Sequence, residues 1–136
     1  MPIPTVQPEV ARVFKTAWFA KTARKARISD GDLCATVGQV MQGQADDLGG
    51  GVFKKRLNDN MHRSIILAKG GRYWVYQYLF AKKDRDNIED DELADFRALA
   101  KAYAGLSAAQ LAQLLKDRDL TEICHVTEAQ VQKRCL

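Results

Sequence analysis

Apolar residues recur with a helical period in two segments near the start of the chain. Thr16 can cap a helix over residues 17–26, and Ser29 begins a second, clearer helical pattern that ends at Gly43. Each segment gathers its apolar residues on one face, as expected of a helix that packs on a core. The apolar faces are Phe19, Ala20, Ala23 and Ala26 in the first helix and Leu33, Val37, Val40 and Met41 in the second.

Three later runs are rich in β-branched, aromatic and apolar residues, as is typical of strands. They cover residues 52–57, 64–69 and 72–80. Gly70-Gly71, between the last two runs, is a two-residue hairpin signal. The run 72–80 is aromatic on both of its alternating faces, which predicts a central strand that is covered on both sides.

Shorter strand patterns stand near both ends of the chain, at residues 12–15 and 120–126. Helical periodicity returns from Asp90 to Tyr103 and again after Ser107. This order of elements indicates an α+β domain. We expect a small antiparallel sheet with the two N-terminal helices packed on it, and further helices toward the C-terminus.

The chain has 136 residues, of which 46% are hydrophobic, enough for one domain with a buried core. All three prolines fall in the first eight residues, so residues 1–11 are expected to form an extended arm. The domain is then expected over residues 12–126, followed by a flexible tail at 127–136. No run is apolar enough to span a membrane and no signal peptide is visible, so we expect a cytoplasmic protein.

The cysteines and histidines do not form a metal-ligand pattern. Cys34, Cys124 and Cys135 include no C-x-x-C pair, and His62 and His125 are the only histidines. We therefore expect reduced cysteines, no bound metal and no other cofactor.

Charge is distributed unevenly along the chain. The first 83 residues hold 14 Lys and Arg against 6 Asp and Glu, whereas the remainder holds 7 against 11. A basic first part is typical of a surface that binds a polyanion. The alternative from charge alone is a basic face in contact with solvent or with an acidic protein.

Three basic clusters come from the predicted sheet region. Their members are Lys54, Lys55, Arg56, Arg63, Lys82, Lys83 and Arg85. Side chains alternate along a strand, so Lys54 and Arg56 are expected on one face. If the three strands are neighbours, the clusters can converge on one concave face, with Tyr78, Phe80 and His62 near its edge.

Such a groove suits RNA, because Lys and Arg neutralise phosphates and aromatic rings stack on unpaired bases. It also suits RNA cleavage without a metal ion. A base can take the proton of the ribose 2′-OH, which then attacks the adjacent phosphate. Cations stabilise the added charge and an acid protonates the leaving oxygen. A Lys crowded by other cations has a lowered pKa and can act as the base.

Several segments resemble one bacterial protein family, the RelE/HigB-type toxins of type II toxin–antitoxin modules, within the RelE/ParE superfamily. They match in order and spacing over about residues 12–124. The segments are 14–21 (FKTAWFAK), 28–30 (ISD), 47–56 (DLGGGVFKKR), 80–88 (FAKKDRDNI), 91–93 (DEL) and 120–123 (LTEI).

The resemblance implies an mRNA interferase fold, a small antiparallel sheet with two N-terminal helices against it. It implies that the protein is an endoribonuclease that cuts mRNA in the decoding site of the ribosome. It also implies inactivation by a cognate antitoxin, usually a small helix-turn-helix protein that represses the operon. Contact with DNA is then indirect, through the antitoxin complex.

By position, the resemblance makes Lys54 the candidate general base, shared with His62, and makes Arg56 and Arg63 the residues that hold the scissile phosphate. Lys82, Lys83 or Arg85 is expected to assist the leaving 5′-oxygen. The RNA-binding candidates are Lys55, His62, Tyr78 and Phe80. Replacing Arg63 with Ala is expected to abolish cleavage and growth arrest while the fold stays intact.

The sequence departs from close relatives in two places. The loop at residues 58–63 lacks their glycines and lysines, and residues 86–88 lack the tyrosine that some relatives carry there. Two alternatives therefore stay open. One is a toxin that, like ParE, binds and inhibits DNA gyrase without RNA chemistry. The other is a toxin with weakened catalysis that acts mainly through its antitoxin complex.

Overall fold

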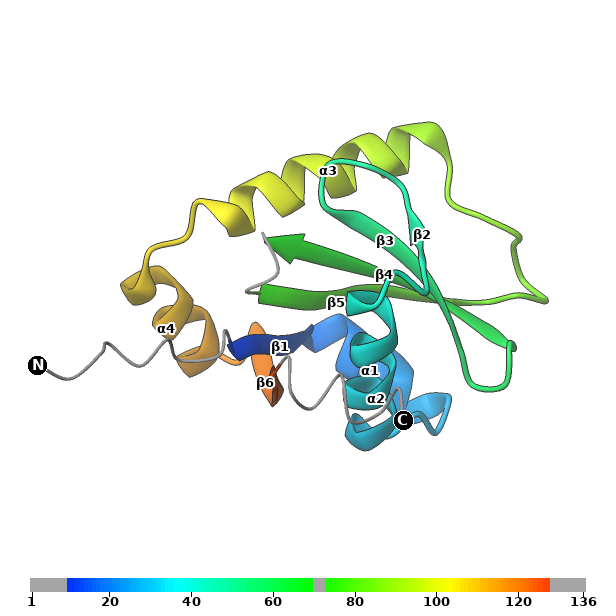
Figure 1. Cartoon of the computed structure of the whole chain (residues 1–136), viewed down its shortest axis with the longest axis horizontal. Coiled ribbons are helices and arrows are strands. Elements are labelled where there is room, and N and C mark those ends of the chain that lie inside the picture. The colour runs from blue at the N-terminus through cyan, green and yellow to red at the C-terminus, as the bar shows by residue number, and fades with distance from the viewer. Residues whose placement is uncertain (1–9, 70–72, 128–136) are drawn as a thin grey trace, which may run out of the picture.

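A computed structural model describes residues 10–69 and 73–127 (Figure 1). Within these residues the chain forms six strands in a single sheet, ordered β2-β3-β4-β5-β1-β6. The predicted α+β class is confirmed. The strands are β1 (Val10–Thr16), β2 (Asp46–Asp47), β3 (Val52–Leu57), β4 (His62–Lys69), β5 (Tyr73–Ala81) and β6 (Leu120–Thr127).

The sheet is mostly antiparallel, with one exception that the sequence does not predict. Strands β3, β4 and β5 form an antiparallel meander, and β6 runs antiparallel to β1. Strand β1, however, pairs parallel with β5, from Arg12 beside Tyr73 to Lys15 beside Tyr76. The expected small antiparallel sheet is therefore confirmed, with β1 and β5 as one parallel pair within it. Parallel pairing requires a long crossover, which the intervening helices and strands provide.

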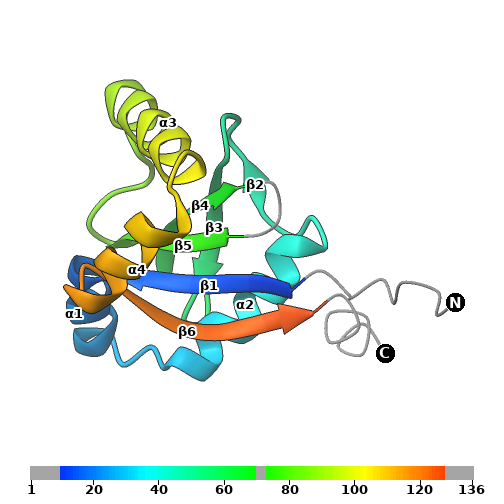
Figure 2. The same cartoon turned by 90° about the vertical axis from the view of Figure 1, so that its left-hand side faces the viewer.

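Helices cover both faces of the sheet within the described residues. Figure 2 shows α3 on one side of the sheet and α1 and α2 on the other. One core cluster packs α1 and α2 against the sheet around Tyr76, and a second packs α3 and α4 against it around Phe14. The helices are α1 (Ala17–Lys25), α2 (Asp30–Met41), α3 (Asp90–Ala104) and α4 (Ala108–Lys116).

The predicted helix starts are confirmed by their caps. Thr16 Oγ1 accepts a hydrogen bond from Phe19 N at 3.0 Å, and Ser29 Oγ accepts one from Asp32 N at 3.1 Å. Each bond satisfies a backbone N–H that has no partner within the first turn. Thr16 is also the last residue of β1, so α1 begins where that strand ends and lies beside β5.

The ends of the sheet differ from the expected boundaries. Strand β1 begins at Val10, within the segment assigned to the arm, and Ala11 is buried in the core. Strand β6 runs to Thr127, the first residue assigned to the tail. The Gly70-Gly71 turn and the remaining arm and tail residues lie outside the described residues.

Cys34 of α2 and Cys124 of β6 form a disulfide between residues 90 positions apart in the sequence. The expectation of reduced cysteines is wrong for this pair. Spacing along the chain could not reveal it, because the two residues meet only when α2 packs beside the edge strand. Among the described residues, no helix is both long and apolar enough to cross a bilayer.

Candidate functional site

A row of basic and aromatic side chains crosses three strands on the α3 face of the sheet. Arg56 stands opposite Arg63, and Arg63 stands opposite Phe80. In the next row, Lys54 and Tyr78 flank Ile65. Directly opposite residues project from the same face of a sheet, about 5 Å apart at Cβ. The meander therefore brings these predicted site residues together. We call the polar and aromatic residues of these two neighbouring rows, taken together, the basic row: Lys54, Arg56, Arg63, Tyr78 and Phe80.

The segment between β5 and α3 lies against the Lys54 end of the basic row. Lys54 Nζ donates a hydrogen bond to Asn87 Oδ1 at 3.3 Å and lies 3.7 Å from a carboxylate oxygen of Asp46. Its side chain is only 18% exposed. The predicted concave face is thus partly filled by the chain itself at this point, and the ammonium group already has polar partners.

Arg63 is largely buried and contacts the backbone of the turn before β4. Its Nη1 donates to Asn60 O at 3.0 Å and to His62 O at 3.1 Å. The turn needs this support, because Asn58, Asp59 and Asn60 all have positive φ. Arg63 therefore holds the loop that the sequence analysis identified as different from relatives.

Arg85 lies over the aromatic end of the basic row. Its guanidinium carbon is 5.5 Å from the ring centre of Phe80, and Nη1 donates to the Tyr78 hydroxyl at 3.3 Å. Both outer nitrogens also bind the Glu92 carboxylate. The hydrogen bonds that Arg85 donates to Glu92 and, with a smaller effect, to Tyr78 raise the pKa of Arg85. The hydrogen bond from Arg85 lowers the pKa of Glu92.

Lys55 and His62 project from the opposite face of the sheet, toward α1 and α2. They stand opposite Ser64 and Leu57 respectively, and Leu57 belongs to the core beneath these helices. Lys55 Nζ donates to Gln44 O at 2.7 Å. Burial, with a smaller effect from neighbouring Arg56, lowers the pKa of Lys55. Strand alternation thus divides the predicted cations between the two faces of the sheet. The expectation that they all converge on one concave face is wrong for Lys55 and His62.

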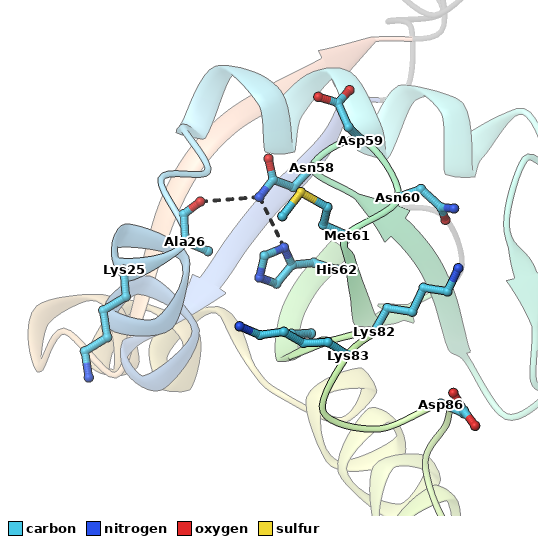
Figure 3. A pocket seen from close by; sticks show the side chains of 11 residues that line it. Lys25, Ala26, Asn58, Asp59, Asn60, Met61, His62, Lys82, Lys83 and Asp86 are labelled. Carbon is cyan, nitrogen blue, oxygen red and sulfur yellow. Dashed lines mark hydrogen bonds between the residues drawn. The ribbon is translucent and has the colours of Figure 1, made fainter.

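Two adjoining clefts open at the end of the sheet where β5 leaves it. The larger, of about 810 Å³, is lined by the 58–62 turn, the end of α1, Lys82 and Lys83. Figure 3 shows His62 beside Asn58, which bridges it to the end of α1: Asn58 Nδ2 lies 3.2 Å from His62 Nδ1 and 3.4 Å from Ala26 O. Lys83 extends below His62, whereas Lys82 extends toward Asn60.

The second cleft, of about 410 Å³, joins the two faces of the sheet. It shares His62 and Lys83 with the first cleft and adds Tyr78, Phe80 and Arg85 from the α3 side. The cleft is therefore the place where predicted site residues from both faces meet. Lys25 of α1 also lines both clefts and contributes a further cation.

Trp18 also lines this cleft and, like Lys25, was not among the site residues predicted from sequence. It lines the second cleft, stacks on Tyr78 with ring centres 5.1 Å apart, and remains 49% exposed. Its position in the first helix could have indicated an exposed aromatic ring. Trp18 precedes buried Phe19 and lies outside the apolar face that the helical period defines.

The site offers cations, stacking surfaces and a histidine around one hollow, which is the set of groups that binds RNA and supports phosphodiester chemistry. Within residues 10–69 and 73–127, no group of three or more His, Cys, Asp and Glu side chains is placed to hold a metal ion.

The model of one protein family, described as the RelE toxin of the RelE/RelB toxin–antitoxin system, matches residues 11–123. The chain belongs to the RelE toxin family. It is therefore a toxin of a toxin–antitoxin system, and its partner is an antitoxin. RelE toxins are generally endoribonucleases. None of the curated proteins compared with the chain matches it.

Proposed function

We propose that this RelE toxin is a metal-independent endoribonuclease that cuts mRNA on the ribosome and so arrests translation in the cytoplasm. The observation that supports this most strongly is the second cleft, where Lys83, Arg85 and His62 meet the aromatic rings of Tyr78 and Trp18. Phosphates and unpaired bases are the ligands that such a combination binds.

The proposed reaction begins when Lys54, the general base, takes the proton of the ribose 2′-OH. For this step Lys54 must leave Asn87 and Asp46 and first lose one proton to solvent. The freed 2′-oxygen attacks phosphorus, and the bond to the 5′-oxygen breaks as a 2′,3′-cyclic phosphate forms. Arg56 stabilises the extra charge on the phosphate.

The leaving 5′-oxygen is stabilised from the cleft side. Arg85 supplies a permanent charge, and Lys83 supplies the proton that the alkoxide takes. Lys82 and Lys55 bind the RNA on either side. Phe80, expected from sequence to bind RNA, is buried beneath Arg85 and supports that side chain instead. Arg63 acts by positioning, because its guanidinium holds the turn that carries His62.

The antitoxin is proposed to be a small helix-turn-helix protein. The exposed basic residues of the site are a suitable target for an acidic antitoxin segment, which would block RNA entry. Contact of the complex with DNA is then made by the antitoxin.

The test is a reconstituted translation reaction with one defined mRNA, in which new 5′ ends are mapped by primer extension. Purified wild-type protein is compared with Arg56→Ala, with and without ribosomes. New ends in register with codons, present only with ribosomes and absent with the variant, support the proposal. Equal cutting of naked RNA contradicts ribosome dependence. A folded protein that stops growth without producing any ends favours gyrase or another bound target.

A further inference from the structure

Trp18 is held in one orientation at the rim of the second cleft. Strand β1 pairs with β5 only as far as Lys15 beside Tyr76, and β5 continues to Ala81. The first turn of α1 fills the space beside this extension and places Trp18 against Tyr78, with 26° between the ring planes.

The ring beneath Trp18 is itself fixed. Tyr78 contacts Phe80 and Phe96, at 5.8 Å and 5.9 Å between ring centres, and its hydroxyl accepts a hydrogen bond from Arg85. Trp18 thus rests on a packed aromatic cluster and needs little further ordering when a ligand binds. Binding surfaces that are ordered in advance lose less conformational entropy on association.

An indole that is 49% exposed still has apolar surface free for contact. The cations near this surface, Lys25, Lys83 and Arg85, line the same cleft. A flat apolar ring among several positive charges matches an unpaired nucleobase next to its phosphates, since every base has a π-face that can stack on an aromatic side chain.

We propose that Trp18 is the stacking platform for an unpaired RNA base next to the phosphate that is cleaved. This inference rests on the proposed function and adds to it a binding residue on α1, outside the basic row. Stacking on an aromatic ring accepts any base, so Trp18 contributes affinity and position rather than a fixed sequence preference.

Binding is tested by tryptophan fluorescence with a 2′-O-methyl RNA hexamer, which has no 2′-OH to attack. The chain has two tryptophans. The other, Trp74, is buried, and its indole N–H has no hydrogen-bond partner among the residues that the structure describes. Trp74→Phe therefore leaves Trp18 as the sole reporter. We expect this variant to be quenched by the hexamer at low salt, and Trp18→Phe to show no quenching.

Cleavage is then compared for Trp18→Phe and Trp18→Leu in the translation reaction. The Phe variant keeps a stacking ring, whereas Leu keeps only apolar volume. We expect the Leu variant to stay folded and to need about tenfold more toxin for half-maximal cleavage, and the Phe variant to stay within about threefold of wild type.

Trp18 is excluded as a platform if the hexamer quenches nothing, or if Trp18→Leu cuts as well as wild type. The same holds if that variant loses only its affinity for the antitoxin, which would make Trp18 a protein contact. Absence of cleavage by wild-type protein overturns the proposed nuclease instead, and quenching in the Trp74→Phe variant then still reports base stacking.

Discussion

Glu92 binds both outer guanidinium nitrogens of Arg85, and the same carboxylate caps the start of α3. Glu92 Oε1 accepts from the Glu89 backbone N at 2.8 Å, and Oε2 accepts from Arg85 Nη1 at 3.1 Å. One side chain therefore fixes the helix start and neutralises a cation that we assign to the RNA site. In the free toxin this cation is paired within the chain.

Replacing Glu92 with Gln should strengthen RNA binding. Gln keeps the oxygen that caps α3 but removes the negative charge that competes with phosphate for Arg85. We expect the affinity for a labelled 2′-O-methyl RNA to rise about threefold at low salt, by fluorescence anisotropy. Asp95→Asn, which removes the same charge one turn further along α3, is the matched control. An equal gain in both variants would show that only net charge matters.

Replacing Arg63 with Ala should abolish cleavage and also weaken the fold, contrary to the expectation from sequence that the fold would be unaffected. The buried guanidinium donates to two carbonyls of a turn with three consecutive positive φ values. Its loss should lower the free energy of unfolding by about 1–3 kcal/mol, measured by urea denaturation. Arg56→Ala, at an exposed position directly opposite, should lose cleavage with little change in stability. Equal stabilities of the two variants would refute a structural role for Arg63.

Local pattern was sufficient to predict most elements of this fold. The run 52–57 coincides with β3, and Thr16 and Ser29 cap the first two helices as expected. These features depend on residues that are close in sequence, so hydrophobic period and capping chemistry identify them.

The site depends on contacts that have no local signal. Parallel pairing of β1 with β5 brings Trp18 to Tyr78, across 60 positions of the chain. Helix α3 covers a face that the sequence analysis left open to RNA, and its first turn supplies Glu92 to Arg85. Alternation predicted that Lys54 and Arg56 share a face, and the aromatic run 72–80 predicted cover on both sides of the sheet. Neither pattern could show that α3 covers the face that carries Lys54 and Arg56.

Acid should destabilise this protein partly through the Arg12–Glu122 pair, which joins β1 to β6 at 2.7 Å and 3.0 Å. The hydrogen bond from Arg12 lowers the pKa of Glu122 in the folded state, with a smaller effect from His125. A lowered folded-state pKa means that the stabilisation is complete above the unfolded-state pKa and is lost as pH falls through the folded value. Below about pH 4.5, wild-type protein should therefore lose more stability than Glu122→Gln.

This difference is measured as the urea midpoint of both proteins between pH 7 and pH 3. Asp95→Asn, which removes an exposed carboxylate of α3, should follow the wild-type pH dependence. Parallel curves for wild type and Glu122→Gln would show that the pair does not couple folding to pH.

Reduction of the Cys34–Cys124 disulfide should lower the melting temperature, because the bond closes a long loop and ties the edge strand β6 to α2. A cross-link over about 90 residues restricts the unfolded chain strongly, and such bonds typically contribute on the order of 2–4 kcal/mol. The measurement is thermal unfolding with and without dithiothreitol, in a Cys135→Ser background that removes the third thiol. We expect a fall of several degrees on reduction. In that background, Cys34→Ser should melt near the temperature of the reduced protein, and dithiothreitol should not change its melting temperature. A reductant effect that persists in Cys34→Ser would disprove the Cys34–Cys124 disulfide.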